Sequence, residues 1–396
     1  MKVLLYFADG FSWQYLEQRP FLDAQSADRR PLDTLLGYSS TIMPAILTGG
    51  WPRETGIWTE YYRDPRPTSA VQKLLSRRRL RWLQVPTNLL RLVYFRVARR
   101  AGRGMEHRLR IPLALSNQFE RHPIKYDQFP PLGLDVPTLA DLFAERGLRV
   151  LFRYVKADAD KELESAWLSE HLDDADVFFF YDPTLDSWGH RLGASVDALG
   201  DRIDALERFL ARAWAEAVER SGDVEMLLFS DHGMTNVTST FDLFERLSGF
   251  ELGTDYLVFM DSTMARFWFP DEIRRHKVLE VLTDLPGRVL DEDQKRALGI
   301  DFSDDRYGHD VLVADEGVVF HPNYFAGPFL HWVRKYPERA MHGYMPDAPS
   351  SRAIFLRCTT DLGRKYPEPT SVRDIFHVIS AVTGAVDAGL EEAALR

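Results

Sequence analysis

Residues 180–190 read FYDPTLDSWGH and follow a mostly apolar run that begins at Ala175. An apolar run that ends in a polar, proline-containing segment predicts a buried strand. Asp186 and His190 stand four residues apart in this stretch. On a helical turn that spacing aims both side chains the same way, so the pair is predicted to face one site beyond the strand.

Two other apolar runs end in the same kinds of side chain. Residues 226–233 read MLLFSDHG and end in the pair Asp231 and His232, while the run from Val3 to Phe7 stops just before Asp9. Ligands bind at the carboxyl edge of the strands in open α/β sheets. Carboxylates and neutral imidazoles are also donors that zinc and manganese accept, so these runs predict a metal site at the rim of a sheet.

Helical and strand-like segments alternate through much of the chain. Residues 137–147 have the proline start and glycine stop of a helix, and apolar residues keep helical spacing from Val196 to Val218. This order predicts an α/β fold in a single catalytic domain, 1–396, with a mostly parallel central sheet sandwiched by helices. The pattern changes at 250–320, which are predicted to form a smaller α+β lobe inserted in that domain.

Composition limits the class of protein. The chain has 396 residues, of which 45% are hydrophobic, and a net charge of -10. A large folded core is therefore expected, and nonspecific binding of nucleic acid by the whole chain is not. The single cysteine, Cys358, excludes an internal disulfide and any cysteine-based metal cluster. The first apolar run is too short for a signal peptide, and no run approaches the roughly 20 apolar residues of a membrane span, so a cytoplasmic location is predicted.

Residues 66–110 differ from the rest of the chain. They are rich in arginine interleaved with leucine and aromatic residues, and no acidic residue lies between Asp64 and Glu106. We interpret this segment as an insertion with three alternative roles. The first role is peripheral contact with an anionic membrane surface through 73–110. The second is a clamp for an anionic substrate, and the third is a face paired with acids elsewhere in the chain.

Residues 39–49 read SSTIMPAILTG and predict a short helix that Ser39 or Ser40 caps and Gly49 ends. The amino terminus of a helix favours anions, so Ser39 is placed to meet a phosphate or a sulfate. The alternative is that these serines only cap the helix.

Five short motifs occur in an order that resembles one known group of proteins. They are ADG at 8–10, a hydroxyl nine residues before Thr48-Gly49, DSWGH at 186–190, SDHGM at 230–234 and HGY at 342–344. The chain thus resembles the alkaline phosphatase superfamily, most closely its nucleotide pyrophosphatase and phosphodiesterase branch. The resemblance implies an alkaline phosphatase-like fold for nearly the whole chain, the arginine-rich insertion excepted.

The resemblance also implies two divalent metal ions, usually zinc, although the same ligand types accept manganese. One ion is expected on Asp186, His190 and His342, and the other on Asp9, Asp231, His232 and the Ser39 oxygen. Ser39 is expected to attack phosphorus and form a phospho-enzyme, because a serine hydroxyl needs a metal or a base to become a nucleophile. Ser40 is the alternative nucleophile, since only the spacing to Thr48-Gly49 favours Ser39.

Two positions depart from the pattern of that branch. Thr55 replaces a histidine, and Glu60 stands where the branch has an asparagine that holds a phosphoryl oxygen. Glu60 is therefore expected to face the substrate, and its carboxylate would repel a phosphate dianion. This departure argues against nucleotide pyrophosphatase activity as such. An aromatic pocket is predicted from Trp58, Tyr61, Tyr62 and Trp188.

We therefore predict a metal-dependent hydrolase of phosphate esters, most specifically a phosphodiesterase, that acts on a phosphorylated small molecule, glycan or lipid. A phosphomutase or phosphotransferase of the same superfamily is one alternative. A noncatalytic module that binds an anionic surface is another. A sulfatase is disfavoured because Ser39 is not followed by Pro-x-Arg, which the nucleophile motif of that class requires.

Overall fold

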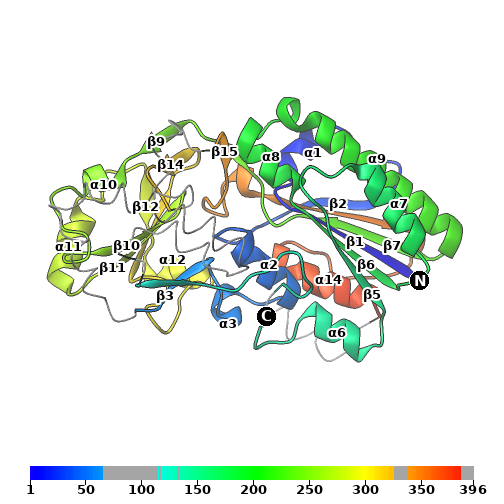
Figure 1. Cartoon of the computed structure of the whole chain (residues 1–396), viewed down its shortest axis with the longest axis horizontal. Coiled ribbons are helices and arrows are strands. Elements are labelled where there is room, and N and C mark those ends of the chain that lie inside the picture. Colours follow the sequence, from blue (N-terminus) through cyan, green and yellow to red (C-terminus); the bar gives the residue numbers. More distant parts are fainter. Residues whose placement is uncertain (66–114, 116, 132–133, 325–337, 385–396) are drawn as a thin grey trace, which may run out of the picture.

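The computed structural model describes residues 1–65, 115, 117–131, 134–324 and 338–384. The arginine-rich insertion predicted at 66–110 lies outside these residues. Figure 1 shows a large lobe built on one extended sheet and a small lobe beside it. The sequence-derived prediction of an α/β fold is confirmed by the structure of the large lobe.

The large lobe contains a six-stranded sheet in the order β2-β16-β7-β1-β6-β5. β1 pairs in parallel with β6 and β7, and β5 pairs in parallel with β6. β16 runs antiparallel between β7 and β2. The strands are β1 (Lys2–Ala8), β2 (Ser26–Leu32), β5 (Val150–Tyr154), β6 (Val177–Asp182), β7 (Val224–Phe229) and β16 (Ala353–Thr359). The sheet is mostly parallel, as predicted.

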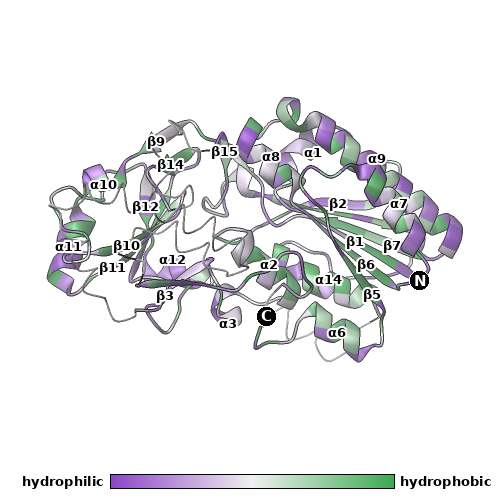
Figure 2. Ribbon diagram, in the orientation of Figure 1, coloured by the Kyte–Doolittle hydropathy of each residue, from purple (hydrophilic) through white to green (hydrophobic). Residues whose placement is uncertain are grey.

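Helices cover both faces of this sheet (Figure 1). One face carries α1 (Trp13–Gln18), α7 (Lys161–His171), α8 (Thr184–Leu192) and α9 (Val196–Ser221), and the other carries α2 (Ser39–Thr48), α6 (Leu139–Glu145) and α14 (Ile375–Val382). Alternate residues of β1 enter the two cores, with Leu4 and Tyr6 on the first face and Leu5 and Phe7 on the second. The central strands β1 and β6 are apolar on both faces for this reason, and Figure 2 shows hydrophobic colour in the middle of the sheet.

The long helix α9 has local signals at both ends. The Ser195 hydroxyl accepts a hydrogen bond from the Ala198 N–H at 3.1 Å, and Gly222 ends the helix with a φ of 72°. Leu199, Ile203 and the later apolar residues of the same helical face are buried against the sheet. Capping and periodicity agree here, which is why this helix was predictable from sequence.

The small lobe is built on a four-stranded antiparallel sheet in the order β10-β11-β13-β12. Its elements are α10 (Leu243–Arg246), β10 (Leu257–Met260), β11 (Met264–Trp268), α11 (Glu272–Glu280), β12 (Gly287–Val289), α12 (Glu292–Ala297) and β13 (Asp310–Ala314). Three two-stranded sheets lie around it: β9 (Ser239–Phe241) with β14 (Val318–Phe320), β8 (Thr235–Asn236) with β15 (Ala340–Met341), and β3 (Tyr61–Arg63) with β4 (Phe119–Arg121). The short helix α3 (Pro52–Thr55) precedes β3.

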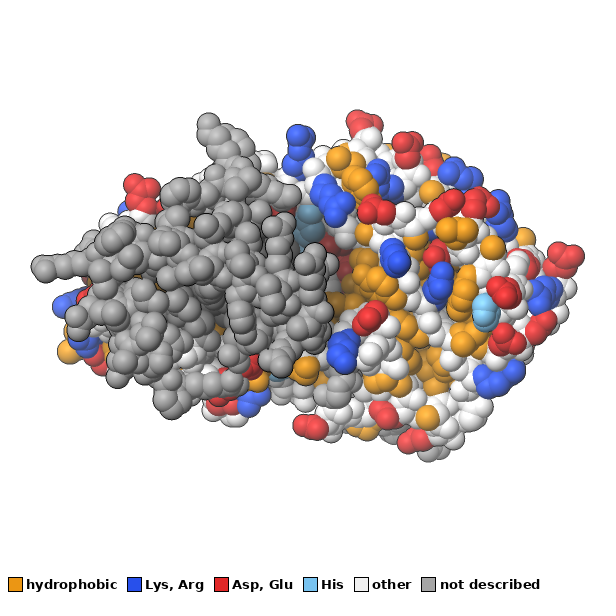
Figure 3. All heavy atoms as spheres, in the orientation of Figure 1, with side chains coloured by type: hydrophobic (Ala, Val, Ile, Leu, Met, Phe, Trp, Pro, Cys, Tyr) orange, Lys and Arg blue, Asp and Glu red, His pale blue; other side chains and the backbone are white. Residues whose placement is uncertain are grey.

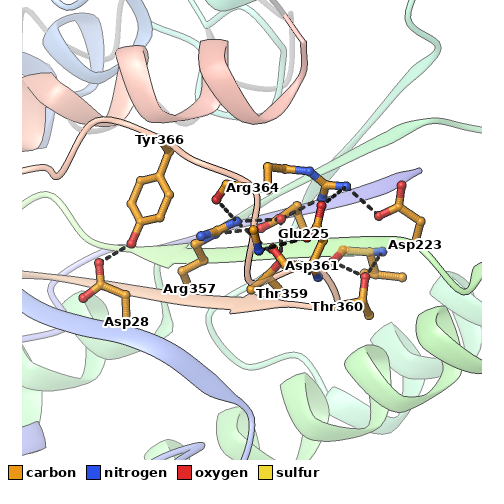
Figure 4. A network of polar contacts seen from close by, with 11 residues as sticks. Asp28, Asp223, Glu225, Arg357, Thr359, Thr360, Asp361, Arg364 and Tyr366 are labelled. Atoms are coloured by element: carbon orange, nitrogen blue, oxygen red, sulfur yellow. Dashed lines mark hydrogen bonds and ion pairs between the residues drawn. The ribbon is translucent and has the colours of Figure 1, made fainter.

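Near the start of β7, a buried carboxylate joins β7 to β16 (Figure 4). Glu225 accepts hydrogen bonds from Arg357 at 2.8 and 2.7 Å, from Thr359 at 2.6 Å and from Arg364 at 2.7 Å. The Glu225 side chain is 0% exposed and that of Arg357 is 5% exposed. A buried pair of this kind is costly to break, because the partner left behind is an uncompensated charge.

The surface of the described residues adds two findings. Figure 3 shows acidic and basic side chains interspersed over the face of the large lobe in view. Within the described residues, no helix combines the length and the apolar character that crossing a bilayer requires.

We expect Glu225→Gln to lower the free energy of unfolding by roughly 3 kcal/mol, because Arg357 would stay buried without its anion. Urea unfolding of the full chain measures this change. Glu219→Gln on the exposed side of α9 is the matched control and should change stability by less than about 0.5 kcal/mol. Equal stability of the two variants would contradict this account of the network.

Candidate metal centre

The predicted donors lie together at the carboxyl edge of the large sheet. Asp9 follows β1, and Asp231 and His232 follow β7. Asp186 and His190 lie on α8, which follows β6. His342 comes directly after β15, and Ser39 is the first residue of α2. The parallel strands end at the same edge, so residues far apart in sequence meet there.

A buried ionic cluster at the end of β6 sets the start of α8. The Asp182 carboxylate accepts hydrogen bonds from the Thr184 N–H at 3.0 Å, from Tyr6 at 2.6 Å and from Lys161 at 2.5 Å. The Lys161 and Asp182 side chains are 9% and 2% exposed. These contacts hold the first turn of α8, and so they orient Asp186 toward the sheet edge. Asp182 and Lys161 were not singled out from the sequence.

Gly10 allows the closest approach between the end of β1 and α8. Its φ is 71°, and a Cβ atom at this position would come within 2.8 Å of the Asp186 Cα. The Asp186 N–H donates to the Asp9 carbonyl at 3.1 Å across the same gap. A side chain at residue 10 would therefore push α8 and its carboxylate away from Asp9.

The first group of donors contains Asp186, His190 and His342, which offer ligand atoms within 4.8 Å of one another. The Asp186 Oδ1 atom lies 3.2 Å from His190 Nε2 and 3.4 Å from His342 Nε2. The other ring nitrogen of His190 contacts the Ala340 carbonyl at 2.9 Å, which fixes the ring orientation. These are the three residues that the family resemblance assigned to one ion.

The second group contains Asp9, Asp186 and His232 within the same 4.8 Å limit. His232 Nε2 lies 3.2 Å from Asp231 Oδ2 and 3.5 Å from Asp9 Oδ1. The other oxygen of Asp231 accepts hydrogen bonds from the backbone N–H groups of Gly10 at 3.1 Å and His232 at 3.0 Å. Asp186 therefore belongs to both groups. Asp231, which the resemblance assigned to this ion with Asp9, His232 and the Ser39 oxygen, is not one of the three residues of the second group.

Ser39 points into the second group. Its Oγ lies 3.3 Å from Asp9 Oδ1 and 3.3 Å from His232 Nε2. The Ser40 Oγ is buried and has no hydrogen-bond partner among the described residues. The prediction that a serine caps α2 is wrong, because Tyr38 is the N-cap residue and its N–H donates to the Thr41 hydroxyl at 3.2 Å. Ser39 is therefore left free of a capping role.

The carboxylates and imidazoles of the site perturb one another. Burial and the neighbouring Asp231 carboxylate raise the pKa of Asp9 well above its usual value. Although burial opposes it, the His190 imidazole lowers the pKa of Asp186. Burial also disfavours the His232 imidazolium, but the Asp231 carboxylate raises the pKa of His232 to about 10. Positive charge is thus strongly favoured among these acids.

Two buried carboxylate oxygens test whether the site fits metal ions. Asp186 Oδ1 and Asp231 Oδ2 are buried, and apart from the candidate ligand imidazoles around them neither accepts a hydrogen bond from a described residue. Buried carboxylate oxygens normally have such partners. Asp and His donors are also of the types that zinc and manganese accept. The residues present therefore fit divalent cations.

A cavity of about 290 Å³ opens beside Ser39. It is lined by two sets of side chains besides the donors, one acidic and one aromatic. They are Glu60, Asp261, Tyr38, Tyr61, Tyr126, Tyr154, Tyr181, Phe259 and Tyr324. Glu60 lines the cavity and forms an ion pair with Arg121, and its predicted contact with a substrate stays a prediction.

The predicted aromatic pocket was only partly right. Tyr61 lines the cavity, but Trp58, Tyr62 and Trp188 do not. Trp58 is instead buried in a separate core, and Trp188 packs against the core of the large lobe. Tyr181 belongs to the stretch with which the sequence analysis began, but no sequence signal linked it to Tyr126 or Tyr324, which reach the cavity from distant segments.

Comparisons with known proteins agree with this architecture. The family described as Type I phosphodiesterase / nucleotide pyrophosphatase matches residues 3–345. Among solved structures, human ectonucleotide pyrophosphatase/phosphodiesterase 5 is similar with a TM-score of 0.65 and 15% identity, over 98% of this chain and 96% of that one. The murine protein of the same name has the same TM-score and coverage at 16% identity. One murine structure is an inactive threonine-to-alanine form in complex with AMP.

We expect Asp186→Asn to weaken binding of zinc at both donor groups, because Asp186 belongs to both. The loss should exceed the roughly 10–100-fold that follows removal of an outer-shell partner. Elemental analysis and competition with a chromophoric chelator measure it on the full chain. Asp304→Asn in the small lobe is the control, and unchanged zinc affinity in Asp186→Asn would remove this residue from the ligand set.

Proposed function

Because the chain belongs to the type I phosphodiesterase / nucleotide pyrophosphatase family and is a hydrolase of the phosphodiesterase type, we propose that it cleaves phosphodiesters through a phospho-enzyme on Ser39 at a centre of two divalent metal ions. The observation that carries this proposal is the position of the Ser39 Oγ. It lies 3.3 Å from both Asp9 Oδ1 and His232 Nε2, and it lines the cavity.

The donor groups support two ions. Asp186, His190 and His342 would hold one, and Asp9, Asp231 and His232 would hold the other, with Asp186 between them. When bound, two such ions would stabilise the deprotonated Ser39 hydroxyl and the negative charge on the departing oxygen. Zinc is the ion that we propose, and manganese suits the same donors.

The residues of the chain then carry out two displacements. The Ser39 Oγ attacks phosphorus, the phosphorus–oxygen bond to the first alcohol breaks, and this alcohol leaves with a proton. Water next attacks the phospho-serine, the bond from phosphorus to Oγ breaks, and Ser39 regains its proton. One water is consumed, and the products are an alcohol and a phosphate monoester.

The position of Ser39 on α2 supports the binding of the phosphoryl group. Ser39 is the first residue of this ten-residue helix. The first N–H groups of a helix and its dipole favour an anion at this end. The phosphoryl oxygens of a bound diester would therefore lie in a favourable field while Oγ faces phosphorus.

We expect Ser39→Ala to reduce the turnover of a chromogenic phosphodiester by at least about 1000-fold, as loss of a nucleophile does. Zinc content should stay close to that of the unsubstituted chain, because six other donors remain. Ser40→Ala is the matched control and should keep most of the activity. The reverse result, with Ser40→Ala inactive and Ser39→Ala active, would make Ser40 the nucleophile.

Turnover in isotopically labelled water separates hydrolysis from phosphoryl transfer. The monoester product should carry one labelled oxygen on phosphorus, because water attacks the phospho-serine. A phosphomutase would form product without solvent oxygen, and that outcome would contradict hydrolysis.

Contact of 73–110 with an anionic membrane surface stays a prediction of the sequence. We expect the full chain to float with vesicles that contain phosphatidylserine at low salt, and to dissociate at high salt, because exposed charges are screened. Deletion of 73–110 should abolish flotation. If the chain did not float at low salt, the membrane role would be contradicted. The clamp for an anionic substrate and the face paired with acids would then remain.

A further inference from the structure

The two histidines of the first donor group are held in different ways. His190 Nδ1 lies 2.9 Å from the Ala340 carbonyl, whereas His342 Nδ1 is buried and has no hydrogen-bond partner among the described residues. An imidazole that binds a metal ion normally donates its other ring N–H to a carbonyl or a carboxylate, and this contact fixes the ring. The orientation of His342 must therefore come from other contacts.

Two aromatic rings pack against the His342 imidazole. His232 stacks on it with ring centroids 3.6 Å apart, and Tyr38 meets it in a T-shaped arrangement at 5.4 Å. Tyr38 is also the N-cap residue of α2 and directly precedes Ser39. One side chain thus contacts a candidate ligand and belongs to the residue that begins the helix of the proposed nucleophile.

A series of hydrogen bonds joins the Tyr38 hydroxyl to Thr263, which lies between β10 and β11 of the small lobe. The Thr263 N–H donates to this hydroxyl at 3.1 Å, and the hydroxyl lies 2.9 Å from Thr263 Oγ1. Thr263 Oγ1 in turn donates to the carbonyls of His342 at 3.1 Å and Gly343 at 2.9 Å. Because each hydroxyl has one proton, the Tyr38 hydroxyl is the donor between the two side chains.

Thr263 is itself fixed within the small lobe. Its side chain is fully buried, and its carbonyl accepts a hydrogen bond from the Ala314 N–H of β13 at 2.8 Å. The antiparallel sheet of the small lobe therefore supports Thr263 from behind. A residue held in this way is able to fix the position of others.

The backbone beside His342 fits closely against the same pair. Gly343 has a φ of 85°, and a Cβ atom there would lie 2.8 Å from Thr263 Oγ1 and 2.9 Å from Tyr38 Cε1. Close-packed groups transmit displacements to one another. A shift of Tyr38 or Thr263 would therefore move the backbone that carries the His342 imidazole.

We infer that Tyr38 and Thr263 are positioning residues, which fix the His342 imidazole relative to Ser39 by joining the start of α2 to the small lobe. The inference rests on the proposed function, because it treats His342 as a metal ligand and Ser39 as the nucleophile. Tyr38 lines the cavity, but Thr263 is not among the described lining residues. An effect of Thr263 on turnover would therefore pass through its neighbours, and Thr263 is the better residue to test.

Thr263→Val removes the Oγ1 atom but keeps the backbone N–H and the shape of the side chain. We expect it to lower the affinity of the full chain for one of two zinc ions by roughly 10–100-fold, as loss of an outer-shell partner does. Competition with a chromophoric chelator measures this loss without any substrate. Thr263→Ser keeps the hydroxyl and should restore the affinity.

Turnover supplies a second measurement on the zinc-loaded chain. For a chromogenic phosphodiester, Thr263→Val should lower kcat by roughly 10–100-fold, because His342 would no longer be aligned with Ser39. KM should change much less than kcat, because Thr263 does not line the cavity.

A second variant keeps the test valid if Thr263→Val fails to fold. Tyr38→Phe keeps the ring against His342 but removes the hydroxyl that contacts Thr263, and it should also weaken zinc binding. Tyr366→Phe is the matched control. It removes a tyrosine hydroxyl that donates to Asp28 on the edge strand β2, and it should leave zinc affinity unchanged.

A double-mutant cycle assigns the effect to His342. If Thr263 acts on zinc binding through this histidine, Thr263→Val should cause no further loss of zinc affinity in a chain that already carries His342→Ala. A loss caused by general destabilisation of the site would instead be the same in both backgrounds.

The outcomes separate this inference from the proposed function. Unchanged zinc affinity in Thr263→Val and Tyr38→Phe, or an equal loss for Thr263→Val with and without His342, overturns the inference and leaves the phosphodiesterase activity in place. Failure of the unsubstituted chain to bind zinc or to hydrolyse a phosphodiester contradicts the proposed function, and the inference fails with it.

Discussion

The parallel pairing of β1 with β6 and β7 is the constraint on which the site depends. Phe7 is in register with Phe229 and with Tyr181, so the three strands end side by side. As a result, one edge of the sheet carries Asp9, the first turn of α8 and Asp231. The register is secured by apolar side chains on both faces, since a slip would exchange the buried sets of the two cores. Hydrophobic packing thus brings acidic groups together that would separate in water.

The crowding of acids at this edge has an energetic cost. Burial and the neighbouring carboxylates raise the pKa of Asp9, and the Asp231 carboxylate raises the pKa of His232 although burial opposes it, so added positive charge would relieve the repulsion between the acids. Divalent cations bound by these donors would supply that charge. Contacts behind the site, such as the ion pair between Lys161 and Asp182, hold the candidate donors in place. The donor side chains are therefore arranged before a cation binds.

The small lobe contributes a different kind of chemistry. Asp261 and Phe259 come from β10 and the turn after it, and they face the large lobe across the cavity. The large lobe supplies Ser39 and the candidate donors other than His342, which follows β15. The small lobe and the Glu60 segment instead border the space for the ester substituents. Division of a site in this way allows the substrate class to change while the reaction is kept.

The sequence by itself determined the α/β class and the long helix α9, and it predicted which residues are candidate donors. Local periodicity, helix caps and short motifs at strand ends depend on residues close together in the chain, and these can be read from the sequence. It did not reveal β2, whose charged and proline-containing residues lack the apolar pattern of the central strands. Only the tertiary structure decided that Asp186 lies in both donor groups, that Ser39 rather than Ser40 reaches Asp9, and that Asp261 and Tyr324 share a cavity with Glu60. These facts depend on the packing of segments far apart in the chain, and no local pattern specifies such distances.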